Sequence, residues 1–217
     1  MIACVDFSEP EVLQLALSDI PVVTIDYIFN DRLAVVSDNA KGMEDLFTYI
    51  YQMGHRRIAY IHGTDSAVTT NRLSSFYRTA EKLGVEIPDE YVMMTRYRDT
   101  KGAGEATEKL LDLRRPPTCI IYPDDFAAFG GIHVIRERGM SIPEDISIAG
   151  YDGIRLAKLT VPHLTTLCQD TQHLGQYAAE KLIDLIEKPK TAMRNITIVQ
   201  GKLYEGQTVL KLDGSRG

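Results

Sequence analysis

Short apolar runs alternate with longer amphipathic segments along most of this chain. Strands are predicted over residues 2–6, 21–25, 33–37, 57–62, 91–95, 118–122, 146–150, 164–167, 196–199 and 202–204. The intervening segments have helical periodicity and predict helices over residues 9–17, 38–53, 70–83, 104–113, 124–138 and 172–187. Strands that alternate with helices predict an α/β fold with parallel sheets in doubly wound order.

The helix predicted to begin near Asp38 or Asn39 has the clearest pattern. Its apolar residues fall at helical spacing and form one buried stripe, made of Met43, Leu46, Phe47, Ile50 and Met53. Gly54 follows the last of them, and a glycine just past a helix commonly ends it.

The composition excludes several classes of protein. The 217 residues include 44% apolar residues, which is enough for a real core. The net charge is −6 and the basic residues are scattered, so this chain alone is not expected to bind nucleic acid. No apolar run approaches the roughly 18 residues of a membrane span, and the N-terminus does not have the pattern of a signal peptide. Three widely spaced cysteines suit neither a zinc site nor a disulfide framework, so we expect a cytoplasmic protein.

No motif of a known catalytic chemistry occurs in the sequence. A nucleophile elbow, a phosphate-binding loop and a dinucleotide fingerprint are all absent, and the histidines have no metal-binding spacing. We therefore expect no enzyme activity, no cofactor and no metal. The adjacent acids Asp124 and Asp125 admit one alternative, a phosphoacceptor site that holds a divalent metal. The further acid and lysine of such a site do not follow in order, so this alternative is disfavoured.

Asp152 is the strongest candidate for binding a ligand. The apolar run Ile146–Gly150 predicts a strand that ends just before this carboxylate. Ligands of open α/β sheets bind beyond the carboxyl ends of the strands. The alternative is a turn aspartate, because Asp-Gly is a common turn dipeptide.

Six segments in order resemble the effector-binding core of the LacI/GalR family of transcriptional regulators. They are Val35–Gly42 with Gly54–Gly63, Arg72–Phe76, Pro117–Asp125, Ser141–Asp152 and Pro162–Asp170. Each motif is weak alone, but the ordered set covers nearly the whole chain. The resemblance implies a two-lobed, type I periplasmic-binding-protein fold whose cleft binds a small molecule, commonly a sugar and sometimes a nucleobase.

The resemblance also implies a set of ligand-binding residues. Arg72 matches an arginine that forks hydrogen bonds to ligand hydroxyls or carboxylates, although a surface helix arginine is the plain alternative. Asp152 matches the ligand-binding carboxylate, and Asp124 matches a polar position that faces the cleft. Asp125 is expected to cap the following helix instead.

The aromatic platform that often lies beneath a bound sugar has no direct counterpart here. Thr100 and Thr171 occupy the two positions where relatives often place it, and the chain has no Trp. Tyr122 lies nearby in the sequence, with Tyr97 and Phe126, and could substitute.

The expected lobe boundaries follow from the same resemblance. Residues 1–36 with 169–188 form the remainder of the N-terminal lobe, residues 37–168 with 189–212 form the C-terminal lobe, and 213–217 form a disordered tail. Crossings between the lobes are expected at residues 27–32 and 167–171. The family's DNA-binding headpiece, hinge helix and first two strand–helix units have no counterpart, so an exposed sheet edge is expected to favour association.

These expectations combine into one functional hypothesis. The chain is a small-molecule sensing domain of a dimeric transcriptional regulator, which reaches operator DNA only through the absent headpiece. A ligand held between Arg72 and Asp152 contacts both lobes when the cleft closes, and it shifts the populations of the two states. Two alternatives stay open: a solute-binding protein of a sugar transporter, and a doubly wound enzyme with an unrecognised site.

Overall fold

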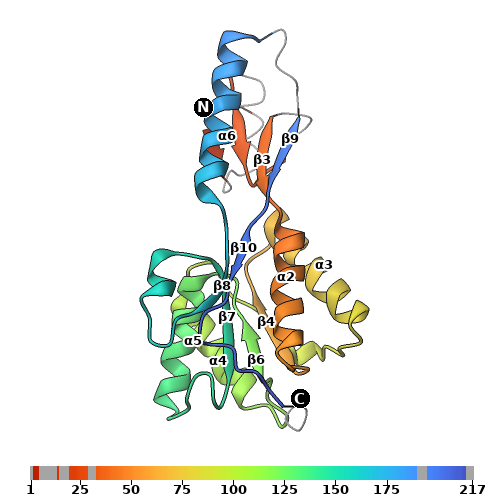
Figure 1. The fold of residues 1–217 in the computed structure, drawn as a ribbon, viewed down its shortest axis with the longest axis vertical. Coiled ribbons are helices and arrows are strands. Elements are labelled where there is room, and N and C mark those ends of the chain that lie inside the picture. The colour runs from red at the N-terminus through yellow and green to blue at the C-terminus, as the bar shows by residue number, and fades with distance from the viewer. Residues whose placement is uncertain (1, 5–13, 15–19, 29–32, 190–194, 214–217) are drawn as a thin grey trace. The chain divides into compact units, whose positions relative to one another are not determined.

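A computed structural model describes residues 2–4, 14, 20–28, 33–189 and 195–213 of the chain (Figure 1). The contacts divide these residues into two compact units. Unit 1 is formed from residues 1–38 and 170–201, and unit 2 from residues 39–169 and 202–217. The chain therefore passes between the units three times, at residues 38–39, 169–170 and 201–202. The helix predicted over residues 9–17 and the tail from residue 214 lie outside the described residues.

The described part of unit 1 is a four-stranded parallel sheet with one long helix packed on it. The strand order is β1 (Ile2–Cys4), β2 (Val23–Ile25), β3 (Ala34–Ser37) and β9 (Ile196–Val199). Helix α6 (Thr171–Glu187) begins at the capping residue Asp170, whose side chain accepts a hydrogen bond from the His173 amide. Val23, Val35 and Val199 pack with Leu174 and Ala178 of α6 to form the unit's small core.

Unit 2 contains the larger sheet, in the order β10-β8-β7-β6-β4-β5. The strands are β4 (Ile58–His62), β5 (Val92–Met94), β6 (Cys119–Ile121), β7 (Ser147–Asp152), β8 (Thr165–Cys168) and β10 (Lys202–Tyr204). All neighbours are parallel except β10, which pairs antiparallel with β8 at the edge of the sheet. The sequence predicted parallel sheets, and β10 is the exception because it returns directly from the last crossing.

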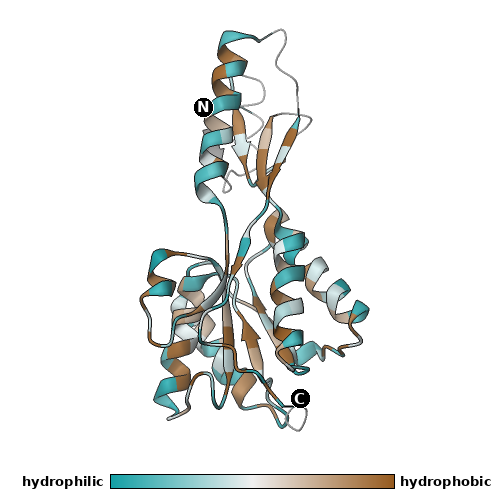
Figure 2. Ribbon diagram, viewed as in Figure 1, coloured by the Kyte–Doolittle hydropathy of each residue, from teal (hydrophilic) through white to brown (hydrophobic). Residues whose placement is uncertain are grey.

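Helices cover both faces of the larger sheet (Figure 1). Helices α2 (Asn39–Gln52) and α3 (Ala67–Lys82) lie on one face, and α4 (Thr100–Leu111) and α5 (Asp125–Glu137) lie on the other. Two short 3₁₀ turns, η1 (Asp89–Tyr91) and η2 (Arg155–Lys158), precede β5 and follow β7. Figure 2 shows that β6 is strongly apolar, as a strand buried on both faces should be.

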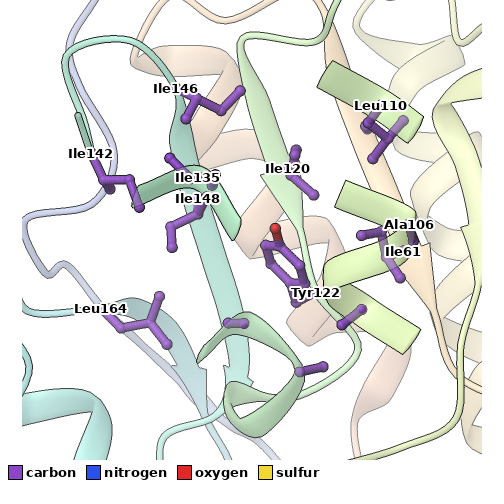
Figure 3. Packing of buried hydrophobic residues seen from close by; sticks show 14 of the residues in the cluster. Ile61, Ala106, Leu110, Ile120, Tyr122, Ile135, Ile142, Ile146, Ile148 and Leu164 are labelled. Carbon is purple, nitrogen blue, oxygen red and sulfur yellow. The ribbon is translucent and has the colours of Figure 1, made fainter. Parts of the chain in front are cut away.

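Side chains along each central strand alternate between two separate cores. Ile58 and Tyr60 of β4 pack with α2 and α3, whereas Ala59 and Ile61 face α4 and α5. Figure 3 shows the second of these cores, where Ile120, Ile135 and Ile148 meet. The alternation fixes the register of the strands, because a slip by one residue would exchange the two faces.

The structure corrects two predictions about the lobes. Residues 189–212 were predicted to lie in the second lobe, but β9 pairs with β3 of unit 1 over four residues. A crossing was expected at residues 27–32, whereas the boundary falls between Asp38 and Asn39. The sequence was misleading here because the residues of a short strand do not indicate which of two sheets the strand joins.

Candidate functional site

Polar residues gather at the carboxyl ends of the central strands of unit 2. Asp152 is the last residue of β7, Asp124 follows β6, and Arg72 lies in α3 after β4. Parallel neighbours end at one edge of a sheet, so these residues lie together at the edge where α/β proteins bind ligands. Arg72 and Asp152 both belong to unit 2, the unit in which the predicted lobe boundaries also place them.

The Arg72 guanidinium is held in one orientation. Its Nε donates to Asn39 Oδ1 at 2.8 Å, and its Nη1 donates to the Pro123 carbonyl at 2.9 Å. Its Cζ atom lies 3.5 Å from the centre of the Tyr151 ring, as in a cation–π contact. Only 2% of the residue is exposed, so Arg72 is not a surface arginine. Within the described residues Nη2 makes no hydrogen bond, and its two protons are available to a ligand.

Asp152 faces this cation without forming an ion pair with it. Its Oδ1 accepts a hydrogen bond from Nε2 of the Gln169 side chain at 2.5 Å. Burial raises the pKa of the Asp152 carboxyl, while the Arg72 charge and the Gln169 hydrogen bond oppose that rise. A φ of 102° places Asp152 in a region that favours glycine, and strained backbone of this kind is often found at binding sites.

Asp125 was expected to cap the helix that follows β6, but the structure shows that Asp124 caps it. Asp124 is the cap of α5: it accepts the Ala127 amide at 2.8 Å and, through its other oxygen, the Arg98 amide at 2.7 Å. Asp125 lies within the helix and accepts hydrogen bonds from Thr166 and Ile154. Asp124 is close enough to act on the charge of Asp152, but contact with a ligand stays a prediction.

The aromatic and hydroxyl positions have separate outcomes. Tyr122 is completely buried in the α4–α5 core, where its hydroxyl bonds to Thr107 Oγ1 at 2.7 Å (Figure 3). Its assignment to the site is therefore wrong, because strand alternation turns it into that core. Thr100 is exposed at the first residue of α4, beside the Arg98–Asp124 contact. Thr171 begins α6 of unit 1. Ligand binding by either threonine stays a prediction.

Four residues of this site were not predicted from the sequence. Asn39, Tyr151 and Gln169 hold Arg72 and Asp152 in place, as described above. The Tyr60 hydroxyl is fully buried near Arg72 and has no hydrogen-bond partner among the described residues. Gln169 could have been found from the sequence, because it directly follows strand β8 in the same way that Asp152 ends β7. Tyr60 lies in the middle of β4, and its position in the sequence does not indicate a role in the site.

The described residues contain no group of three histidine, cysteine or acidic side chains that could hold a metal ion. No helix in the described part of the chain is long and apolar enough to cross a membrane.

Comparison with known proteins identifies the class of this protein. Residues 47–209 match the family described as periplasmic binding protein-like domain, and the chain belongs to that family. The curated relatives that it resembles are transcriptional repressors, and the similar solved structures include LacI family regulators.

The relatives make this likeness specific. The chain is 28% identical over 194 residues to the probable HTH-type transcriptional repressor ExuR of Bacillus subtilis, covering 88% of this chain and 58% of that protein. It is 28% identical over 201 residues to the ribose operon repressor of Haemophilus influenzae, covering 91% and 60%. A LacI family regulator from Enterococcus faecium, solved with bound ribose, aligns with a TM-score of 0.87 and 25% identity over 98% of this chain and 79% of that one. The chain thus spans about three fifths of the curated relatives.

Proposed function

We propose that this chain senses a hydroxyl-rich small molecule, such as a sugar, for a LacI-type transcriptional regulator. The observation that carries the proposal is that Arg72 and Asp152 lie at the same end of the larger sheet, each with hydrogen-bonding capacity to spare. A fixed guanidinium with free donors and a carboxylate with free lone pairs suit a ligand whose hydroxyls both accept and donate hydrogen bonds. The relatives named above are repressors rather than enzymes or transport proteins.

Sensing requires that the ligand distinguish two states of the regulator. A ligand shifts an equilibrium only by its differential affinity for the two states. A coupling of about 1–3 kcal/mol would change operator affinity roughly 5–150-fold. We infer that the regulator works as a cytoplasmic homodimer, because paired half-sites in DNA mirror a two-fold protein. We propose that operator DNA is contacted by a separate DNA-binding headpiece rather than by the residues of this domain.

The test is calorimetric titration of the 217-residue chain with ribose, other pentoses, hexoses and nucleosides. We expect one compound to bind at a single site. The Asp152→Asn variant should weaken that binding by roughly tenfold to a hundredfold, because a hydrogen bond to a charged group contributes about 1.5–3 kcal/mol.

The matched control is Asp65→Asn, which neutralises an exposed carboxylate in the loop after β4. This variant should bind as the wild type does. Equal affinity of Asp152→Asn and wild type for the bound compound would show that the ligand lies elsewhere. Absence of binding by every compound in the panel would contradict the proposed ligand class.

A further inference from the structure

A hollow lined by several charged residues lies at the amino-terminal ends of the strands of the larger sheet, opposite the ends that carry Arg72 and Asp152. Its volume is about 480 Å³, within the size range of small-molecule sites. Arg56 and Arg57 line it directly before β4, and Arg115 lines it before β6. Because β4 and β6 are parallel neighbours, the residues that precede them meet at the amino-terminal edge.

Two of these arginines converge on Tyr91. The Tyr91 hydroxyl donates to the Arg115 carbonyl at 2.5 Å, which holds that residue's backbone at the hollow. Burial raises the pKa of Tyr91, and the charges of both Arg57 and Arg115 oppose the rise. The two cations therefore both lie near one tyrosine, although 58 positions separate them in the chain.

The charges of these arginines are not neutralised by ion pairs. Arg57 Nε donates to the Pro116 carbonyl at 3.1 Å, which orients the side chain and leaves both of its terminal nitrogens available. No ion pair joins Arg57 or Arg115 to a carboxylate in the described part of the chain. Guanidinium groups whose donors are not taken up by ion pairs favour the binding of an anion.

Arg56 supplies a third cation that is also held in place. Its guanidinium carbon lies 3.7 Å from the centre of the Tyr51 ring, and its Nη1 donates to the carbonyls of Tyr51 and His55, each at 2.9 Å. A guanidinium fixed in this way loses little freedom when a ligand binds.

We propose that this hollow is a second ligand site, which binds the phosphate group of a small phosphate monoester. A phosphate monoester carries a charge of about −1.5 to −2 and three acceptor oxygens, which suits converging guanidinium groups. Glu86 and Glu90 also line the hollow. They leave it with one net positive charge, which accepts a compact dianion and disfavours an extended polyanion such as nucleic acid.

The test is an NMR titration of the ¹⁵N-labelled chain with glycerol 2-phosphate, with glycerol as the uncharged comparison. We expect saturable shifts of the Val85, Tyr91 and Arg115 amides with the phosphate and none with glycerol. The Arg57→Gln/Arg115→Gln variant should raise the Kd by roughly tenfold or more, and Arg115→Gln alone should raise it by a smaller factor. Arg115 is exposed, so the single variant reports on binding even if the double variant is poorly folded.

Two controls separate this site from charge effects and from the sugar site. Arg78→Gln/Arg114→Gln removes the same net charge from exposed residues outside the hollow, and it should leave the Kd unchanged. Arg72→Gln should also leave it unchanged while abolishing binding of the sensed compound. Three results would each overturn the proposal. The first is an equal loss of phosphate affinity in the Arg78 and Arg114 control, and the second is a set of amide shifts confined to residues near Arg72. The third is a titration that does not saturate below ~10 mM phosphate monoester.

Discussion

At the scale of single residues, Asp125 links the strand that carries Asp152 to its neighbours. Its Oδ2 accepts the Ile154 amide at 2.8 Å, and its Oδ1 accepts the Thr166 hydroxyl at 2.6 Å. Gly150 lies so close that a Cβ atom there would be 2.2 Å from Asp125 Oδ1. Asp125 thus holds the turn after β7, in which Asp152 and Gly153 both have positive φ.

Replacement of Asp125 by asparagine should therefore impair both stability and ligand binding. In the variant, the NH₂ group of the asparagine replaces one of the two oxygens that accept from the Ile154 amide and the Thr166 hydroxyl. A buried donor that loses its acceptor in this way costs about 1–3 kcal/mol of stability. Urea denaturation measures the loss, and titration with the sensed compound measures the affinity. The comparison is Asp145→Asn, which changes an exposed carboxylate that accepts the Ser141 amide. If Asp125→Asn is no less stable than Asp145→Asn, the linking role is wrong.

The site could be predicted from the sequence only where position in the chain determines position in space. Asp152 was identifiable because it ends a strand, and strand ends meet at one edge. The capping roles of Asp124 and Asp125 could not be separated, because two adjacent aspartates satisfy the same capping pattern. The direction of the Tyr122 side chain could not be predicted either, because packing decides which side of the strand faces α4 and α5.

At the scale of elements, the contact between α4 and α5 depends on glycine. A Cβ atom on Gly130 of α5 would lie 1.9 Å from the Thr100 carbonyl oxygen at the start of α4. The obstacle is backbone, so a side-chain rotation cannot relieve it. Helix α4 itself begins earlier than the predicted residue 104, because Asp99 caps it by accepting the Gly102 amide at 2.9 Å.

Gly130→Ala should accordingly lower the free energy of unfolding by about 1–3 kcal/mol, the usual cost of overpacking. The matched variant is Gly175→Ala in α6, where no atom of the described residues lies within 4 Å of the added methyl group. That change should raise helix stability by about 0.5–1 kcal/mol, because alanine loses less backbone entropy than glycine. Thermal denaturation of both variants checks the pair, and opposite signs are required.

The order and type of the elements were largely predictable because apolar periodicity is strong here. Helices α2, α3, α5 and α6 and all the described strands occur within a few residues of their predicted ranges. Sheet membership was less predictable. Ile196 and Ile198 remain exposed on β9, so their pattern did not identify the sheet that the strand extends.

At the scale of the whole molecule, two buried groups give stability opposite dependences on pH. Burial lowers the pKa of His55 from 6.5 to about 4, while its ring bonds to Thr118 Oγ1 at 2.9 Å and to the Leu210 carbonyl at 3.0 Å. Burial raises the pKa of Asp125 from 3.8 to about 7. Between pH 4 and 6.5 the unfolded chain binds more protons at the histidine, and the folded chain binds more at the aspartate.

Stability should therefore rise with pH through His55 and fall with pH through Asp125. Relative to wild type, His55→Gln should show a steeper decrease of unfolding free energy from pH 4 to 7. Asp125→Asn should shift the slope toward an increase over the same window. Urea denaturation at several pH values measures both slopes, and a slope unchanged by either substitution would show that the corresponding group titrates normally.

The pairing of β9 with β3 also constrains how the protein is made. Synthesis on the ribosome delivers residues 34–37 early and residues 196–199 only after nearly all of unit 2 has emerged. The smaller sheet therefore lacks β9 until most of the larger unit has been synthesised. A chaperone that shields nascent β3 would protect it during that interval, and slowed translation near residue 195 would prolong the exposure.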